Sequence, residues 1–130
     1  MNRERLQQEV IAYWRKMAWE ALASAKSELG ANRLGFAINR AYYACFYIAS
    51  AVLLQDQQKF VKHSGLRAAV HRHLVKEGRL DAKWGKIYDQ LFESRQEADY
   101  QELAQLEPEE AAELNRQAEA FVAEMEKLLC

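Results

Sequence analysis

The stretch Asn39–Leu54, NRAYYACFYIASAVLL, decides the fold of this 130-residue chain. Apolar or small side chains recur here at the spacing of one helical face, at Ile38, Ala41, Tyr42, Cys45, Ala49 and Val52. A second stripe covers Tyr43, Phe46, Tyr47, Ser50 and Leu54. A helix that is apolar nearly all round belongs inside a bundle, where each large buried side chain contributes about 1.5–3 kcal/mol. We therefore predict that this helix forms the centre of an all-α protein.

The rest of the chain predicts four more helices joined by short loops. Their expected ranges are residues 2–29, 64–78, 81–99 and 108–128. The central helix is expected to run from a cap at Asn32 to an end around Leu54 to Gln57. The first helix is expected to bury one apolar stripe, made of Leu6, Val10, Tyr13, Trp14, Met17, Ala21 and Ala25. The expected architecture is a five-helix, mostly up-and-down bundle that forms a single domain over residues 1–130.

Charge and cysteine usage narrow the function classes. A net charge of −1 argues against a nucleic-acid grip by the whole surface, although a local basic patch is compatible with it. Cys45 and Cys130 are far apart and do not have the spacing of a zinc site. Residues 1–30 carry charge throughout, and the nearly uncharged run Ala41–Asp56 is short and rich in tyrosine. We expect a cytoplasmic protein with no membrane segment, metal or cofactor.

Two polar groups interrupt the apolar pattern and are candidates for function. Arg40 shares a helix face with Tyr43 and Tyr47. Further along, Arg95 and Asp99 are four residues apart, so their side chains meet on one face. Either they form a simple ion pair within the helix, or Arg95 reaches toward Arg40 and Tyr43. In the second case Asp99 is the counter-ion between the two arginines. The tyrosines are either core side chains or surfaces on which bases stack.

Three motifs occur in the order found in one known family. Asn39–Phe46, NRAYYACF, is similar to the YYAxF signature, preceded by an arginine, of a prokaryotic branch of the HEPN domain family. Lys62–Gly65, KHSG, resembles the KHxG connector of that branch, and Ser94–Tyr100, SRQEADY, resembles its RxxADY motif. The resemblance implies an α-helical bundle that is often dimeric. It also implies a small nucleotidyltransferase as partner, in a toxin–antitoxin or similar pair.

Many HEPN proteins are metal-independent endoribonucleases in which an Arg-x4–6-His motif supplies an arginine for the phosphate and a histidine for acid–base work. Counting from Arg95, this chain has Tyr100, Gln101 and Glu102 where that histidine would stand. Cleavage needs a group that titrates near neutral pH, and an unperturbed tyrosine or arginine does not. His63, in the basic loop Lys59–His63, is the histidine best placed to approach Arg40 or Arg95 from another element.

The first hypothesis is a HEPN-like interaction module, a homodimer acting with a nucleotidyltransferase-type partner and carrying a degenerate ribonuclease motif. A metal-independent endoribonuclease that uses Arg95 and Arg40 with His63 is the second, and a nucleotide-binding protein without catalysis is the third. The expected catalytic residues are Arg95 and His63. The expected nucleotide- or RNA-binding residues are Arg40, Tyr43, Tyr47, Arg95, Asp99 and Tyr100.

Overall fold

The computed structural model describes residues 2–99 and 105–130 and is all-α, as predicted. No strand occurs in these two ranges. A short π-helical segment, η1 (Val70–Val75), continues α3 (His63–Ala69) without a break. The elements are α1 (Asn2–Gly30), α2 (Leu34–Gln55), α3 (His63–Ala69), η1 (Val70–Val75), α4 (Ala82–Asp99) and α5 (Pro108–Glu126).

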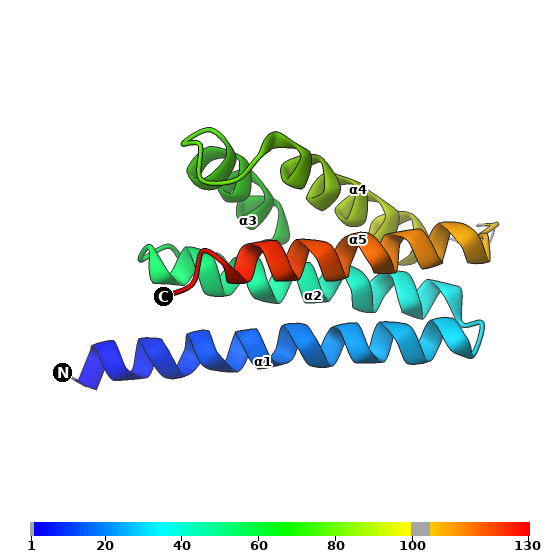
Figure 1. Ribbon diagram of the computed structural model, residues 1–130, viewed down its shortest axis with the longest axis horizontal. Coiled ribbons are helices and arrows are strands. Elements are labelled where there is room, and N and C mark those ends of the chain that lie inside the picture. The colour runs from blue at the N-terminus through cyan, green and yellow to red at the C-terminus, as the bar shows by residue number, and fades with distance from the viewer. Residues whose placement is uncertain (1, 100–104) are drawn as a thin grey trace.

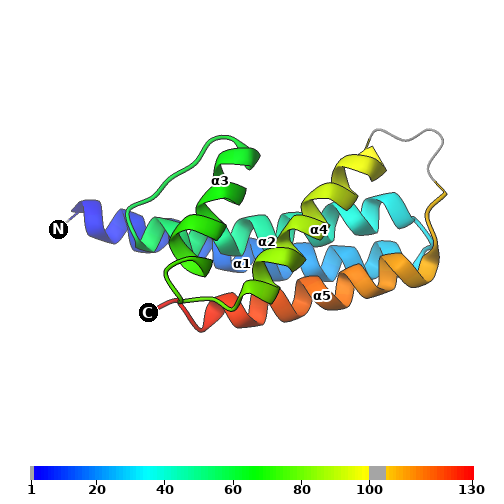
Figure 2. The same ribbon diagram turned by 90° about the horizontal axis from the view of Figure 1, so that it is seen from above.

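The helices form two layers around α2. Helices α1, α2 and α5 run side by side along the long axis of the molecule, while α3 and α4 lie on the side of α2 that faces away from α1 (Figure 1). Seen from above, α3 and α4 cross α2 obliquely (Figure 2). Helix α2 contacts α1, α3, α4 and α5, which agrees with its predicted place at the centre of the bundle.

Small residues let the neighbours of α2 approach it closely. Five alanines of this helix are completely buried: Ala37, Ala41, Ala44, Ala49 and Ala51. Among the described residues, α2 alone is long and apolar enough to cross a membrane, but 67% of its most apolar window is buried inside the bundle. A core helix of a helical bundle has the same properties.

The starts of two helices differ from the prediction. Asn32 is no cap; it has a positive φ of 61° in the turn after α1, a conformation that asparagine tolerates better than most residues, and α2 begins at Leu34. Ser64 lies inside α3, which begins one residue earlier at His63. The predicted starts at Asp81 and Pro108 agree better with the structure. Asp81 Oδ1 accepts a hydrogen bond of 3.0 Å from the backbone of Lys83, and Pro108 opens α5.

The predicted buried stripe of α1 is wrong over the first half of the helix. Leu6, Val10 and Tyr13 are 59%, 38% and 57% exposed. The core instead takes Ile11 and Leu22, which lie on a different face of the same helix. In addition, the first turns of α1 extend past the end of the other helices (Figure 1).

A polar contact fixes α3 and η1 against α4. Asp89 of α4 accepts hydrogen bonds from Arg67 Nε at 2.7 Å and pairs with His71 Nε2 at 2.9 Å. The His71 ring approaches α4 closely because Gly85 has no side chain; a Cβ atom there would lie 2.8 Å from His71 Cε1. This anchoring holds the start of α3, and therefore His63, in a defined place beside α2.

Candidate functional site

The candidate site is built around the phenol of Tyr42, in the middle of α2. Its side chain is completely buried, and its Oη lies 2.7 Å from His63 Nδ1 at the start of α3. Tyr88 of α4 donates a weaker hydrogen bond of 3.4 Å to the same oxygen. Burial raises the pKa of Tyr42 to about 12, so the group is a neutral phenol at physiological pH. One hydroxyl group thus links three helices.

His63 lies in an aromatic cage formed by α2. Its ring centroid is 4.4 Å from that of Phe46 and 5.6 Å from that of Tyr43. Burial lowers the pKa of His63, and the positive charge of Arg95 lowers it further. The imidazole is therefore neutral at pH 7. Because Tyr42 occupies Nδ1, Nε2 is the ring nitrogen that faces away from the phenol.

Arg95 reaches from α4 onto the same aromatic surface. Its Cζ lies 4.8 Å from the ring centroid of Tyr42 and 6.0 Å from that of Tyr43, and only 16% of its side chain is exposed. Arg95 Nη1 also donates a 3.3 Å hydrogen bond to Asp99 Oδ2. The two arrangements considered from the sequence therefore coexist, because the ion pair within α4 forms and the guanidinium also reaches α2.

Asn39 and Asp99 connect Arg95 to Arg40. Asn39 Oδ1 accepts hydrogen bonds from Arg40 Nε at 3.1 Å and Nη2 at 2.6 Å, while Asn39 Nδ2 donates to Asp99 Oδ1 at 3.4 Å. The Arg40 Cζ lies 5.1 Å from the Tyr43 ring centroid. Asn39, Arg40 and Asp99 also line a cavity of about 600 Å³. The two arginines therefore belong to one continuous polar surface.

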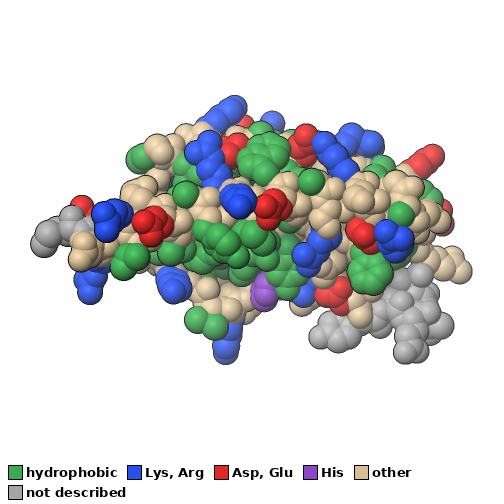
Figure 3. Space-filling view, turned by 90° about the horizontal axis from the view of Figure 1, so that it is seen from below, with side chains coloured by type: hydrophobic (Ala, Val, Ile, Leu, Met, Phe, Trp, Pro, Cys, Tyr) green, Lys and Arg blue, Asp and Glu red, His purple; other side chains and the backbone are tan. Residues whose placement is uncertain are grey.

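We refer to Arg40, Tyr42, His63 and Arg95 as the arginine–histidine cluster. Of the other expected site residues, Tyr43 and Asp99 contact the arginines of this cluster. Tyr47 is half-buried, and its ring centroid is 5.9 Å from that of Tyr43. Tyr100 lies outside the described residues. Figure 3 shows one face on which hydrophobic side chains gather in the middle, with a histidine at their edge and arginine or lysine side chains around them.

The chemistry available here is anion binding and proton transfer. Arg95 donates to the carboxylate of Asp99, whereas Arg40 is bonded to the neutral amide of Asn39, so the two guanidinium groups have one carboxylate between them. Guanidinium groups bind phosphate oxygens bidentately, and a neutral imidazole can accept a proton. Within the described part of the chain, no three His, Cys, Asp or Glu residues are grouped so that they could hold a metal ion.

Sequence reasoning missed the residues that join the cluster together. The helical spacing assigns Tyr42 to the core stripe, and Asn39 appears only within the NRAYYACF motif. The signal for Tyr42 was its hydroxyl group, since a buried phenol requires a hydrogen-bond partner. The pattern did not indicate which partner, because His63 is 21 residues away, across a loop.

Comparison with known proteins shows the family to which the chain belongs. Residues 11–128 match the HEPN domain, and the chain belongs to the HEPN family. It is similar to a UPF0332 protein from Thermotoga maritima, with 44% identity over 122 residues that cover 94% of this chain and 92% of the relative.

Two further relatives come from Methanocaldococcus jannaschii. "Putative toxin MJ0142" is 28% identical over 112 residues, which cover 86% of this chain and 76% of that protein. "Putative toxin MJ0605" is 33% identical over 114 residues, which cover 88% of this chain and 84% of that protein. The matches span nearly the whole bundle, including α2, α3 and α4.

Burial and the nearby charge of Arg95 predict that His63 has a lowered pKa, and this can be measured. An NMR titration of the imidazole C–H signals should give His63 a midpoint below 6.5, and Arg95→Met should raise it. Since the unfolded state binds this proton first, the contribution of His63 to stability should fall as the pH drops below 6.5. Arg116→Met, an exposed change on α5, is the control and should leave the midpoint unchanged. A midpoint that does not respond to Arg95→Met would contradict this geometry.

Proposed function

We propose that this chain is a toxin-like HEPN module that binds RNA at the arginine–histidine cluster. The observation that carries the proposal is the meeting of Arg95 and His63 on Tyr42, although the two residues come from different helices. The names of the two archaeal relatives support a toxin-like role.

We further propose that the module acts in the cytoplasm with a small nucleotidyltransferase-type protein. A pull-down from native lysate that recovers this chain alone would contradict that partnership.

The cluster suits a phosphate of single-stranded RNA. Arg95 and Arg40 supply guanidinium groups that match phosphate oxygens in geometry and charge. Half-buried Tyr43 contacts both of them and offers an aromatic surface beside the phosphate. A free nucleotide offers the same phosphate and base, so nucleotide binding without catalysis is the simpler form of the same proposal.

One observation favours cleavage as a second function. No histidine follows Arg95 at the Arg-x4–6-His spacing, and His63 supplies an imidazole from α3 instead. Its lowered pKa keeps the imidazole neutral near pH 7, and in the tautomer whose Nδ1–H donates to Tyr42 Oη the free Nε2 would accept the proton of a ribose 2′-hydroxyl. The 2′-oxygen would then bond to phosphorus, and the bond from phosphorus to the 5′-oxygen would break. The leaving 5′-oxygen would take a proton from the imidazolium, and Arg95 would hold the phosphate.

RNA cleavage in excess chelator tests these two functions. Wild-type cleavage should fall by about 10²-fold or more in His63→Ala, since acid–base groups contribute about 10²–10⁴-fold, and should be lost in Arg95→Ala. Arg116→Ala, a change in an exposed arginine on α5, should cleave normally. Cleavage that survives Arg95→Ala would rule out this assignment. If the wild type does not cleave but binds RNA in an Arg95-dependent way, the module binds without catalysis.

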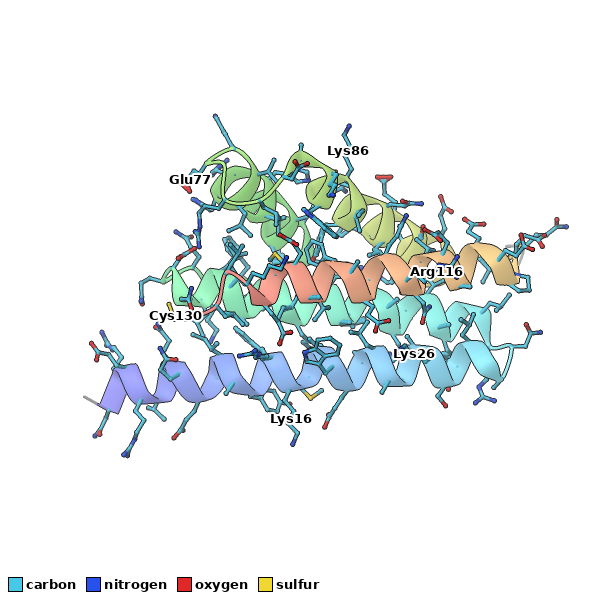
Figure 4. All side chains as sticks on the ribbon, viewed as in Figure 1. Lys16, Lys26, Glu77, Lys86, Arg116 and Cys130 are labelled. Carbon is cyan, nitrogen blue, oxygen red and sulfur yellow. The ribbon has the colours of Figure 1, made fainter. Side chains whose placement is uncertain are left out.

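We also propose that two copies pair through α1. Apolar residues recur along α1 at alternating spacings of four and three residues, the pattern of a coiled-coil seam: Leu6, Val10, Tyr13 and Met17. The first three are exposed. In an antiparallel pair, Leu6 would face Met17 of the second copy, Val10 would face its Tyr13, and Glu9 would lie opposite its Lys16. The labelled Lys16 extends away from the bundle (Figure 4), so it can reach a second copy.

Charge reversal distinguishes this dimer from other arrangements. Glu9→Lys and Lys16→Glu should each shift sedimentation toward the monomer, because each places like charges opposite one another. The double variant should restore the dimer, since both pairs are then exchanged. Lys86→Glu, an exposed charge reversal on α4 and outside the seam, is the control. A double variant as monomeric as the single ones, or a wild type that sediments as a monomer, would contradict the pairing.

A further inference from the structure

Phe36 is an unusual residue on the first turns of α2. Its side chain is 64% exposed, although the helix is otherwise the most buried element of the bundle. It borders the 600 Å³ cavity on one side. It also borders a second hollow of about 310 Å³ that is lined by Ser24, Glu28, Phe36 and Arg40. The ring therefore borders two hollows, and a flat ligand in either could lie against it.

Arg40 lines both hollows and lies one helical turn beyond Phe36. Four residues advance a helix by about 6 Å, so the ring and the guanidinium share one face. Asn39 holds Arg40 through Nε and Nη2. In the described part of the chain, no hydrogen bond engages Nη1, whose two N–H groups can therefore bind an anion.

The neighbouring charges leave Arg40 as the cation that can bind an anion at this place. Arg33, at the same end of α2, is paired with Glu28 at 2.9 Å and takes up most of the charge of that carboxylate, which acts only weakly on Arg40. Asp99 is engaged by Arg95 and by Asn39. An aromatic ring beside a fixed guanidinium is the combination that binds a base and its phosphate in single-stranded nucleic acids.

We propose that Phe36 is a base-stacking platform for single-stranded RNA, with the adjoining phosphate bound by Arg40. This inference rests on the RNA-binding function proposed above and extends it along α2. Phe36, Arg40, Tyr43 and Tyr47 follow one face of that helix. A strand held at Arg95 and His63 therefore continues past Arg40, and the nucleotide that flanks the bound phosphate stacks on Phe36.

The test uses a short 2′-O-methyl oligoribonucleotide, which cannot be cleaved by attack of the 2′-oxygen, with one 2-aminopurine as stacking probe. Wild type should quench the probe on binding, and Phe36→Trp should keep the quenching. Phe36→Ala should abolish it and weaken binding about 5-fold to 150-fold, the range expected for the loss of one base–aromatic stack. Val61→Ala, a change in an apolar residue that is 93% exposed and lies outside both hollows, should behave as wild type.

Salt dependence separates the two halves of the platform. Arg40→Gln should reduce the slope of log K against log salt by about 0.7, the value for one phosphate contact on a single strand. Phe36→Ala should leave that slope unchanged, because a base stack releases no counterions.

Three results would overturn parts of the account in different ways. If Phe36→Ala binds and quenches like wild type while Arg95→Ala does not bind, the platform is wrong and the cluster stands. If neither Arg95→Ala nor His63→Ala affects binding, the proposed function itself fails. If a mononucleotide displaces the oligonucleotide at the same concentration as unlabelled RNA does, the site takes a free nucleotide and the RNA platform is wrong.

Discussion

The hydroxyl group of Tyr42 lies inside the bundle, where a phenol without hydrogen bonds would cost free energy of about 1–3 kcal/mol. It meets this requirement with His63 from α3 and Tyr88 from α4. The same contact that satisfies the core therefore brings an imidazole to α2. Arg95 then packs on the ring of that phenol, so the positions of the candidate functional groups depend on a core residue.

This dependence explains how a HEPN chain can lack the histidine of the Arg-x4–6-His motif and still have an imidazole beside its arginine. A motif within one helix fixes a distance through helical spacing, whereas here two helices are joined through a shared aromatic ring. The arrangement demands that α3 be held firmly, and the Asp89 contacts with Arg67 and His71 do so. The close approach permitted by Gly85 belongs to the same support. Packing far from the site thus determines its geometry.

Helical periodicity was enough to predict the all-α class, the central helix and the Arg95–Asp99 pair, because each depends on residues close in sequence. It was not enough for Leu6, Val10 and Tyr13, since a stripe shows which residues share a face but not whether a neighbour covers that face. The links from Tyr42 to His63 and from Asn39 to Asp99 span 21 and 60 residues. Such contacts follow from how α3 and α4 cross α2, and no local pattern carries that information.

The most direct test of the account is an NMR titration of the protein, labelled at histidine and arginine side chains, with a 2′-O-methyl oligoribonucleotide. The central claim is that His63 and Arg95 form one phosphate site. It predicts that the His63 ring and the Arg95 Nε–H signals shift together with a single dissociation constant, while those of His71 and Arg67 stay unchanged. Shifts confined to His71 and Arg67, or different dissociation constants for His63 and Arg95, would contradict it.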